Sequence, residues 1–143
     1  MALQPGLQFE FRYEVPRKAL VPVLFDDIEA ARALPPVLAT GYMAGIMECA
    51  CLDAIRPHTD WPAQQSVGTL VSFSHLAATV AGDTVTVRGT LVGVEGRKLV
   101  FEVEAHDGAE KIAEGRHERV LIDAARFREK VAAKAQRQGL ALE

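Results

Sequence analysis

Hydrophobic and polar residues alternate in five stretches of the chain. The first is short and rich in aromatic residues, and the other four follow one another through the second half of the sequence. The stretches are residues 7–15, 66–79, 84–94, 98–106 and 111–122. A period of two is typical of β-strands with one buried face. Short turns separate the last four stretches, among them the hairpin signal Asp107-Gly108. These four stretches therefore predict consecutive antiparallel strands.

A different pattern occupies residues 40–55, TGYMAGIMECACLDAI, which do not alternate. Thr40 is a suitable N-cap, and a proline follows the segment, so we expect a helix. From residue 33 to residue 52 the only charged side chain is that of Glu48. A helix that is apolar on nearly all sides is predicted to be buried.

Shorter helical segments are predicted on either side of this arrangement. Residues 23–34 can hold one or two helical turns, which Pro35-Pro36 ends. Near the end of the chain, Asp123 can cap a last helix in which Phe127 and Val131 form an apolar edge among basic residues.

The order of elements is strand, helix, and then four strands. One apolar helix and one half-buried antiparallel sheet can bury each other if the sheet curls around the helix. A chain of 143 residues is long enough for one domain with a substantial core and short for two. We therefore expect a single α+β domain over residues 1–143.

Composition and charge exclude several classes of protein. With 49% hydrophobic and 24% charged residues the chain is typical of a soluble globular protein, and a net charge of −3 gives no electrostatic reason to expect nucleic acid as a partner. No apolar stretch is long enough to cross a membrane, and the start of the chain lacks the pattern of a signal peptide. Cys49 and Cys51 point to different sides of the helix, so we expect free thiols in a cytoplasmic protein.

Glu48 is the strongest candidate for chemistry. An ionised carboxylate in an apolar helix needs a raised pKa or a close partner, and both situations are common at catalytic sites. The alternative is a structural carboxylate satisfied by backbone groups or at a subunit interface. Thr40 lies two helical turns earlier, in a direction that differs by roughly 80°, so it cannot touch Glu48, although both can border one elongated cleft. Taken alone, Thr40 is more often only a cap.

Three residues of the strands are weaker candidates. His75 interrupts a strand of small and apolar residues, and together with Glu48 it would provide a proton acceptor near neutral pH. Gly68 would let backbone approach a ligand closely, with a bulge or simple packing as the alternative. Arg119 lies in the last strand, where most arginines are solvated. The four histidines show no chelating spacing, so no metal is expected.

Four motifs in this order resemble the fluoroacetyl-CoA thioesterase group of the hotdog superfamily. They are ATGYMAGIMECAC, VGTLVSFSHLAAT, VEGRKLVFEVEAHDG and GRHERVLI, and the resemblance extends from the first strand into the last helix. It implies a hotdog fold and hydrolysis of an acyl-CoA substrate to a carboxylic acid and CoA, without a metal or other cofactor. It also implies Thr40, Glu48 and His75 as the catalytic set, and Gly68 and Arg119 as residues that contact the substrate.

The segment before Thr40 departs from this family. Members that select fluoroacetyl-CoA carry phenylalanines there, whereas here EAARALPPVLAT contains none. We therefore expect a small or medium acyl-CoA as the substrate, without specialisation for fluoroacetyl-CoA. Two alternatives remain open, namely a hotdog enoyl-CoA hydratase and a non-catalytic module that binds acyl-CoA.

The predicted architecture also has consequences for assembly. A single curled sheet around one helix leaves an edge strand and one side of the helix uncovered. We therefore expect at least a homodimer, with the active sites between the subunits.

Overall fold

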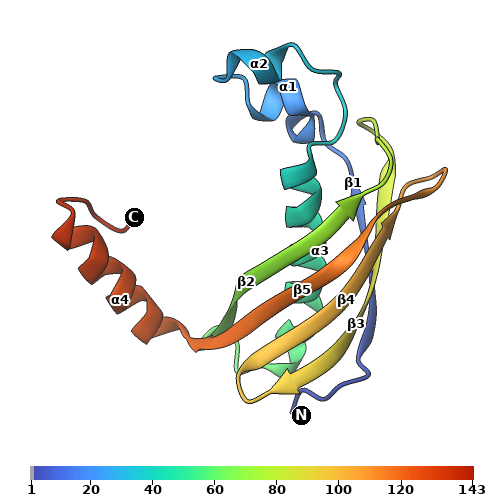
Figure 1. Cartoon of the computed structure of the whole chain (residues 1–143). Coiled ribbons are helices and arrows are strands. Elements are labelled where there is room, and N and C mark those ends of the chain that lie inside the picture. The colour runs from blue at the N-terminus through green and yellow to red at the C-terminus, as the bar shows by residue number, and fades with distance from the viewer. Residues whose placement is uncertain (1) are drawn as a thin grey trace.

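In a computed structural model, which describes residues 2–143, one antiparallel sheet curls around a central helix (Figure 1). The order of strands across the sheet is β1-β3-β4-β5-β2, and every neighbouring pair is antiparallel. The strands are β1 Gln8–Glu14, β2 Gln64–His75, β3 Thr84–Glu95, β4 Lys98–His106 and β5 Lys111–Asp123. The predicted curled sheet around a helix is confirmed.

The helices follow the predicted plan. The central helix α3 is Thr40–Ile55, and the last helix α4 is Ala124–Arg137. The remaining helical segments are short: η1 Arg17–Ala19, α1 Val21–Leu24, α2 Glu29–Arg32 and η2 Arg56–His58. Asp123 caps α4 as predicted, because its carboxylate accepts a hydrogen bond of 3.0 Å from the backbone N–H of Arg126.

The core lies between the concave face of the sheet and one side of α3. The strands contribute Val85, Val87, Leu91, Leu99, Phe101, Val103 and Ala105, and the helix contributes Met43, Ile46, Met47, Ala50, Cys51 and Ile55. Complete burial of a side chain such as Phe101 stabilises the fold by about 1.5–3 kcal/mol. This core fixes the position of α3 relative to the strands that carry the candidate site.

The prediction that α3 is buried on nearly all sides is wrong for the single chain. Gly41, Cys49 and Asp53 are exposed, and the Glu48 side chain retains 39% of its accessible surface. Small and apolar residues such as Gly41 and Cys49 also occur on the exposed side of the helix. Hydrophobicity therefore varies too little with direction around α3 for the sequence pattern to distinguish the two sides.

Strand β2 forms one edge of the sheet, since only β5 pairs with it. Residues 68–72, in its middle, are all exposed. The register of β2 against β5 shifts between Gly68 and Leu70, so Thr69 is an extra residue that forms a β-bulge. The edge and the bulge both border the candidate site.

Two further findings concern the chain as a whole. Among residues 2–143 no helix is both long and apolar enough to cross a membrane. Both cysteines are free thiols, as their spacing predicted. Cys51 is buried, as small apolar thiols are expected to be, whereas Cys49 is exposed on the open side of α3.

Candidate active site

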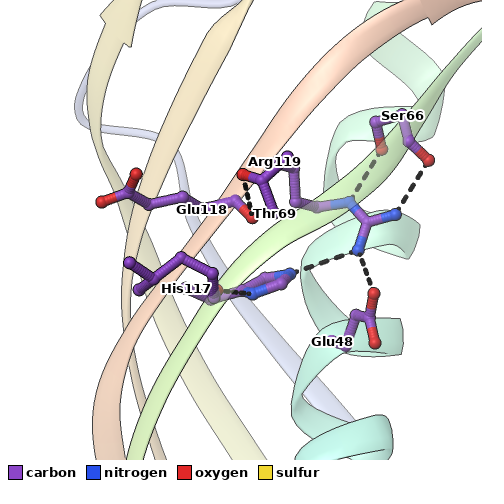
Figure 2. Close-up of polar contacts among 7 residues, drawn as sticks. Glu48, Ser66, Thr69, His117, Glu118 and Arg119 are labelled. Carbon is purple, nitrogen blue, oxygen red and sulfur yellow. Dashed lines mark hydrogen bonds and ion pairs between the residues drawn. The ribbon is translucent and has the colours of Figure 1, made fainter.

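Glu48 has the close partner that the sequence predicted, and this partner is Arg119. The Nη1 group of Arg119 donates a hydrogen bond of 2.9 Å to the Glu48 carboxylate (Figure 2). Arg119 itself is buried, with 4% of its surface exposed. An arginine in such a position stabilises an ionised carboxylate and fixes its direction. Strand β5 therefore holds the acid of α3 in place.

Arg119 is in turn held by the edge strand. Its Nε donates to the hydroxyl oxygen of Ser66 at 2.8 Å, and its Nη2 donates to the backbone carbonyl of the same residue at 2.9 Å (Figure 2). The two bonds fix the plane of the guanidinium group, because its donors form a rigid fork. Three elements thus meet at Glu48: α3, β5 and β2.

Gly68 is the point where β2 comes closest to this carboxylate. A Cβ atom added to Gly68 would lie 2.5 Å from Oε1 of Glu48 and 3.3 Å from the ring of His117. Contacts of 2.5 Å do not occur for real side chains, so only glycine leaves room for the carboxylate in its present position. The spatial proximity of Gly68 and Glu48 explains why a glycine stands inside this strand.

The bulge at Thr69 decides which residues of β2 face the helix. Gly68 and His75 are separated by an odd number of positions, so a regular strand would turn them to opposite faces. With the extra residue, Gly68 lies opposite Arg119 and His75 lies opposite Ala113, all on the face that packs against α3. Both candidate residues therefore border the helix because the strand is irregular between them.

His75 pairs with Thr40. The Thr40 hydroxyl and Nδ1 of His75 are 2.8 Å apart, and the second ring nitrogen, Nε2, is buried without a hydrogen-bond partner among the described residues. A single hydrogen bond orients the ring, whereas Nε2 remains available to exchange a proton. This pair lies at the start of α3.

Two sequence-based expectations need correction here. Thr40 is not the N-cap of α3, because the cap position belongs to Ala39 and Thr40 is the first helical residue. Its hydroxyl contacts His75 of β2 and makes no cap hydrogen bond, so a tertiary contact replaces the local one. The expected pairing of His75 with Glu48 is also absent, since Glu48 bonds to Arg119 instead. The two pairs lie two helical turns apart, roughly 12 Å along the helix axis.

Sequence reasoning missed Ser66 and His117. His117 is completely buried, its Nδ1 lies 2.8 Å from the carbonyl oxygen of Leu70, and its Nε2 lies 3.2 Å from Nη1 of Arg119. The spacing of His117 and Arg119 on one strand places both on the same face. This alternation was visible in the sequence, but it could not identify the buried face at this end of β5.

A cysteine nucleophile and a metal site find less support among the described residues. Burial raises the pKa of the Cys51 thiol to about 12, so this cysteine is not an active nucleophile near neutral pH. No group of three or more metal-ligating side chains occurs within residues 2–143. What the site offers is one oriented carboxylate, one histidine with an unpartnered nitrogen, and a hydroxyl group. Such a set is suited to proton transfer or to attack on a carbonyl carbon.

Comparison with known proteins places the chain in a family. The family model for the fluoroacetyl-CoA-specific thioesterase FlK matches residues 25–125. The fluoroacetyl-CoA thioesterase of Streptantibioticus cattleyicolor is 40% identical over 129 residues, which cover 90% of this chain and 92% of that protein.

Solved structures agree with this match. One structure of FlK superposes with a TM-score of 0.90 at 40% identity, covering 94% of this chain and 98% of that chain. A thioesterase superfamily member from Thermus thermophilus gives a TM-score of 0.83 at 26% identity, covering 95% and 96% of the two chains. The predicted hotdog fold is confirmed by these matches. The chain therefore belongs to the fluoroacetyl-CoA-specific thioesterase family.

Proposed function

We propose that the protein hydrolyses a small or medium acyl-CoA, releasing the carboxylic acid and free CoA. The observation that carries this proposal is the placement of Glu48. Its carboxylate is fixed by the buried Arg119 and faces a glycine that leaves room for it, and the Glu48 side chain keeps 39% of its surface exposed. A variant of the relative FlK has been solved with fluoroacetate and CoA, the two products of a thioester hydrolysis.

Glu48 is the proposed base or nucleophile. As a base it removes a proton from the water that attacks the thioester carbonyl. As a nucleophile it attacks the carbonyl itself, and water then hydrolyses the resulting anhydride. Both routes end in the same products and require no metal or other cofactor. Gly68 is the proposed point of close backbone approach to the substrate, whereas Arg119 acts on the substrate through Glu48.

His75 and Thr40 are the proposed groups for the leaving thiolate and the carbonyl oxygen. Nε2 of His75, which has no partner in the described chain, would deliver a proton to the sulfur of CoA. Thr40 orients the ring through Nδ1. The first backbone N–H groups of α3 have no helical acceptors, so they are suited to a carbonyl oxygen that gains negative charge.

A homodimer with the active site between its subunits would bring these groups together. Within one chain, Glu48 and the Thr40–His75 pair are separated by roughly 12 Å along α3. The exposed edge of β2 and the exposed side of α3 are unpaired surfaces next to both groups, and Leu70 and Val71 on this edge are 41% and 48% exposed. A second copy that pairs along β2 would cover these surfaces and place Glu48 of one copy near the histidine of the other.

Mixed dimers test this assembly. Glu48→Gln and His75→Ala subunits are each expected to be inactive. If each site takes its acid and its histidine from different subunits, half of the randomly mixed dimers regain one intact site, about a quarter of wild-type activity. No recovery, or a particle that sediments at the 15.5 kDa of the single chain at micromolar concentration, would contradict the proposal.

The identity of the acyl group depends on the segment above the start of α3. Figure 1 shows α1 and α2 at this end of the molecule. The segment presents aliphatic side chains, with Ile28 50% and Leu34 52% exposed, and no aromatic ring after Phe25. An aliphatic lid offers less aromatic surface to a fluorinated acyl group and would exclude water differently. We therefore propose that the protein accepts acyl groups of small or medium size and does not select the fluoroacetyl group among them.

The function is tested by release of CoA thiol from acetyl-, fluoroacetyl-, propionyl-, butyryl- and phenylacetyl-CoA. We expect turnover of at least one of these, with kcat at least about 10³-fold lower in Glu48→Gln, because an amide is neither base nor nucleophile. Saturable binding without any release would contradict hydrolysis and favour a binding module. Hydration of an enoyl-CoA without thiol release would favour a hydratase. The two free thiols fit the proposed cytoplasmic location.

A further inference from the structure

His117 is a completely buried polar residue that the proposed reaction does not use. Its ring lies beside two aromatic rings, with centroids 6.2 Å from Phe73 and 6.1 Å from Phe101. Such a pocket is expensive for a polar ring unless its nitrogen atoms have partners. A phenylalanine would fill the space without this requirement. The polar atoms of His117 therefore call for an explanation.

The partners of the ring determine its protonation state. The carbonyl oxygen of Leu70, 2.8 Å from Nδ1, can only accept, so Nδ1 carries the hydrogen. Nη1 of Arg119, 3.2 Å from Nε2, can only donate, so Nε2 presents its lone pair. The ring is thus a neutral imidazole with a single allowed tautomer. Figure 2 shows its contact with Arg119.

Nη1 of Arg119 has two hydrogen atoms, and both are engaged. One points to the Glu48 carboxylate at 2.9 Å and the other to Nε2 of His117 at 3.2 Å. Because the two N–H bonds diverge at a fixed angle, a partner for one sets the direction of the other. The ring also borders the space that the Glu48 carboxylate occupies beside Gly68, since a Cβ added to Gly68 would lie 3.3 Å from the His117 ring.

We infer that His117 is a positioning residue, which holds Nη1 of Arg119 so that this group aims Glu48 at the substrate. His117 touches neither Glu48's reaction partner nor CoA, and acts through Arg119. The inference rests on the catalytic role proposed for Glu48. It adds that this role requires a neutral hydrogen-bond acceptor behind the arginine, which Nε2 of His117 supplies.

The surroundings of the ring favour its neutral state. Burial lowers the pKa of His117, and the charge of Arg119 lowers it further, whereas the Leu70 carbonyl and the carboxylates of Glu48 and Glu118 raise it. The charged groups thus come from β5 and α3. The rings packed against it from β2 and β4, Phe73 and Phe101, are apolar. A proton on Nε2 would face the N–H groups of Arg119 and would displace them from Glu48.

Two substitutions separate positioning from packing. His117→Phe keeps an aromatic ring in the pocket but removes the acceptor, whereas His117→Gln keeps a neutral amide that can donate and accept. We expect kcat to fall about 10- to 100-fold in the phenylalanine variant at nearly unchanged KM, and to stay within about threefold in the glutamine variant. His106→Phe, on β4 and outside the site, serves as the control and should stay within about twofold.

The inference is overturned if His117→Phe keeps wild-type kcat while Glu48→Gln is inactive. It is also overturned if the phenylalanine and glutamine variants lose activity equally and in proportion to their loss of melting temperature.

A measurement on the unaltered protein separates this inference from the proposed function. Nitrogen-15 spectra of the histidines should show His117 as the Nδ1–H tautomer from pH 5 to 8, and an Nε2–H or doubly protonated ring at pH 7 would overturn the inference. Absence of any acyl-CoA turnover would contradict the proposed function, and with it the catalytic purpose assigned to His117. The spectra test the Nδ1–H tautomer that holds Arg119 independently of activity, so the two failures are distinguishable.

Discussion

The two ends of the candidate site are built in different ways. Around Glu48, three secondary-structure elements supply a buried arginine with four hydrogen-bond contacts, to Ser66 twice, to Glu48 and to His117. At the other end, a single hydrogen bond joins Thr40 to His75, and Nε2 of His75 is buried without a partner in the described chain.

This difference indicates where the protein fixes geometry before substrate arrives. A carboxylate that attacks, or that aligns water, must have its direction set in advance, because misplacement by 1 Å costs a large factor in rate. A histidine that donates a proton late in the reaction can take its final position when the substrate supplies the missing partner. We call the surroundings of Glu48, with Arg119, Ser66 and His117, the dense end of the site, and the Thr40–His75 pair the sparse end. The activity is expected to be sensitive to small changes of shape at the dense end and tolerant of them at the sparse end.

Among substitutions that leave Glu48 in place, Arg119→Lys should have the largest effect, because a lysine ammonium cannot replace the fork that binds Ser66, Glu48 and His117 together. We expect kcat to fall at least about 100-fold and the free energy of unfolding to fall by about 2–4 kcal/mol. Thiol release and urea unfolding measure the two effects. Arg88→Lys, in an exposed pair with Glu10, should change stability by less than about 0.5 kcal/mol. If Arg119→Lys and Arg88→Lys changed activity and stability equally, Arg119 would not be a special anchor of the site.

Gly68→Ala tests the dense end by one methyl group. The new Cβ would lie 2.5 Å from Oε1 of Glu48, so the carboxylate must move. We expect kcat to fall about 10- to 100-fold while the fold persists. Gly93→Ala is a matched control, since it also lies beside a bulge and its Cβ would meet Val100 at an ordinary 3.4 Å. Kinetics of both variants that match wild type would contradict the proposed tight fit.

Thr40 tests the sparse end. Thr40→Val removes the hydroxyl group that orients His75 and keeps the shape of the side chain, whereas Thr40→Ser keeps the hydroxyl. We expect about a 10-fold lower kcat for valine, little change for serine, and a stability change under about 1 kcal/mol for both. Steady-state kinetics with the best acyl-CoA substrate provide the comparison. If Thr40→Val lowered kcat more than Gly68→Ala does, the sparse end rather than the dense end would be the more sensitive part of the site.

The smallest expected effect concerns stability at mildly acidic pH. The unfolded chain protonates His117 near pH 6.5, and the folded chain does so only at lower pH, because burial lowers the pKa of this ring. The unfolded state then binds more protons, so the free energy of unfolding should decrease as the pH falls below about 6.5, by at most about 1.4 kcal/mol per pH unit. Urea unfolding at pH 5–8 should show a shallower decrease in His117→Gln. Identical slopes would mean that His117 does not titrate differently on folding.

Much of the fold was predictable because local patterns specify it. Alternation in β4, the Asp107-Gly108 turn and the Asp123 cap each act within a few residues, and the structure confirms them. The exposed side of α3 was not predictable, since small residues such as Gly41 and Cys49 occur on it as they do in the core. What covers a surface is not encoded by hydrophobic pattern alone.

The site was predictable only in part. A lone carboxylate in an apolar helix required a partner, and this requirement was met, but by Arg119 rather than His75. The two partners are 71 positions apart in the chain, and nothing local distinguishes Arg119 from Arg116 on the same strand. Arg116 lies on the other face and pairs with Glu118. Only the tertiary structure separates these two arginines.

The bulge at Thr69 has a consequence for any change in the length of this chain. Side chains in β2 alternate between the two faces with a period of two residues, so one extra residue moves every later side chain to the opposite face. Deleting Thr69 would shorten the chain by less than one per cent, yet it would turn either Gly68 or His75 away from α3. An alignment gap at this position therefore means more than a missing side chain. A relative that lacks the residue must build its site from the opposite set of positions on one half of the strand.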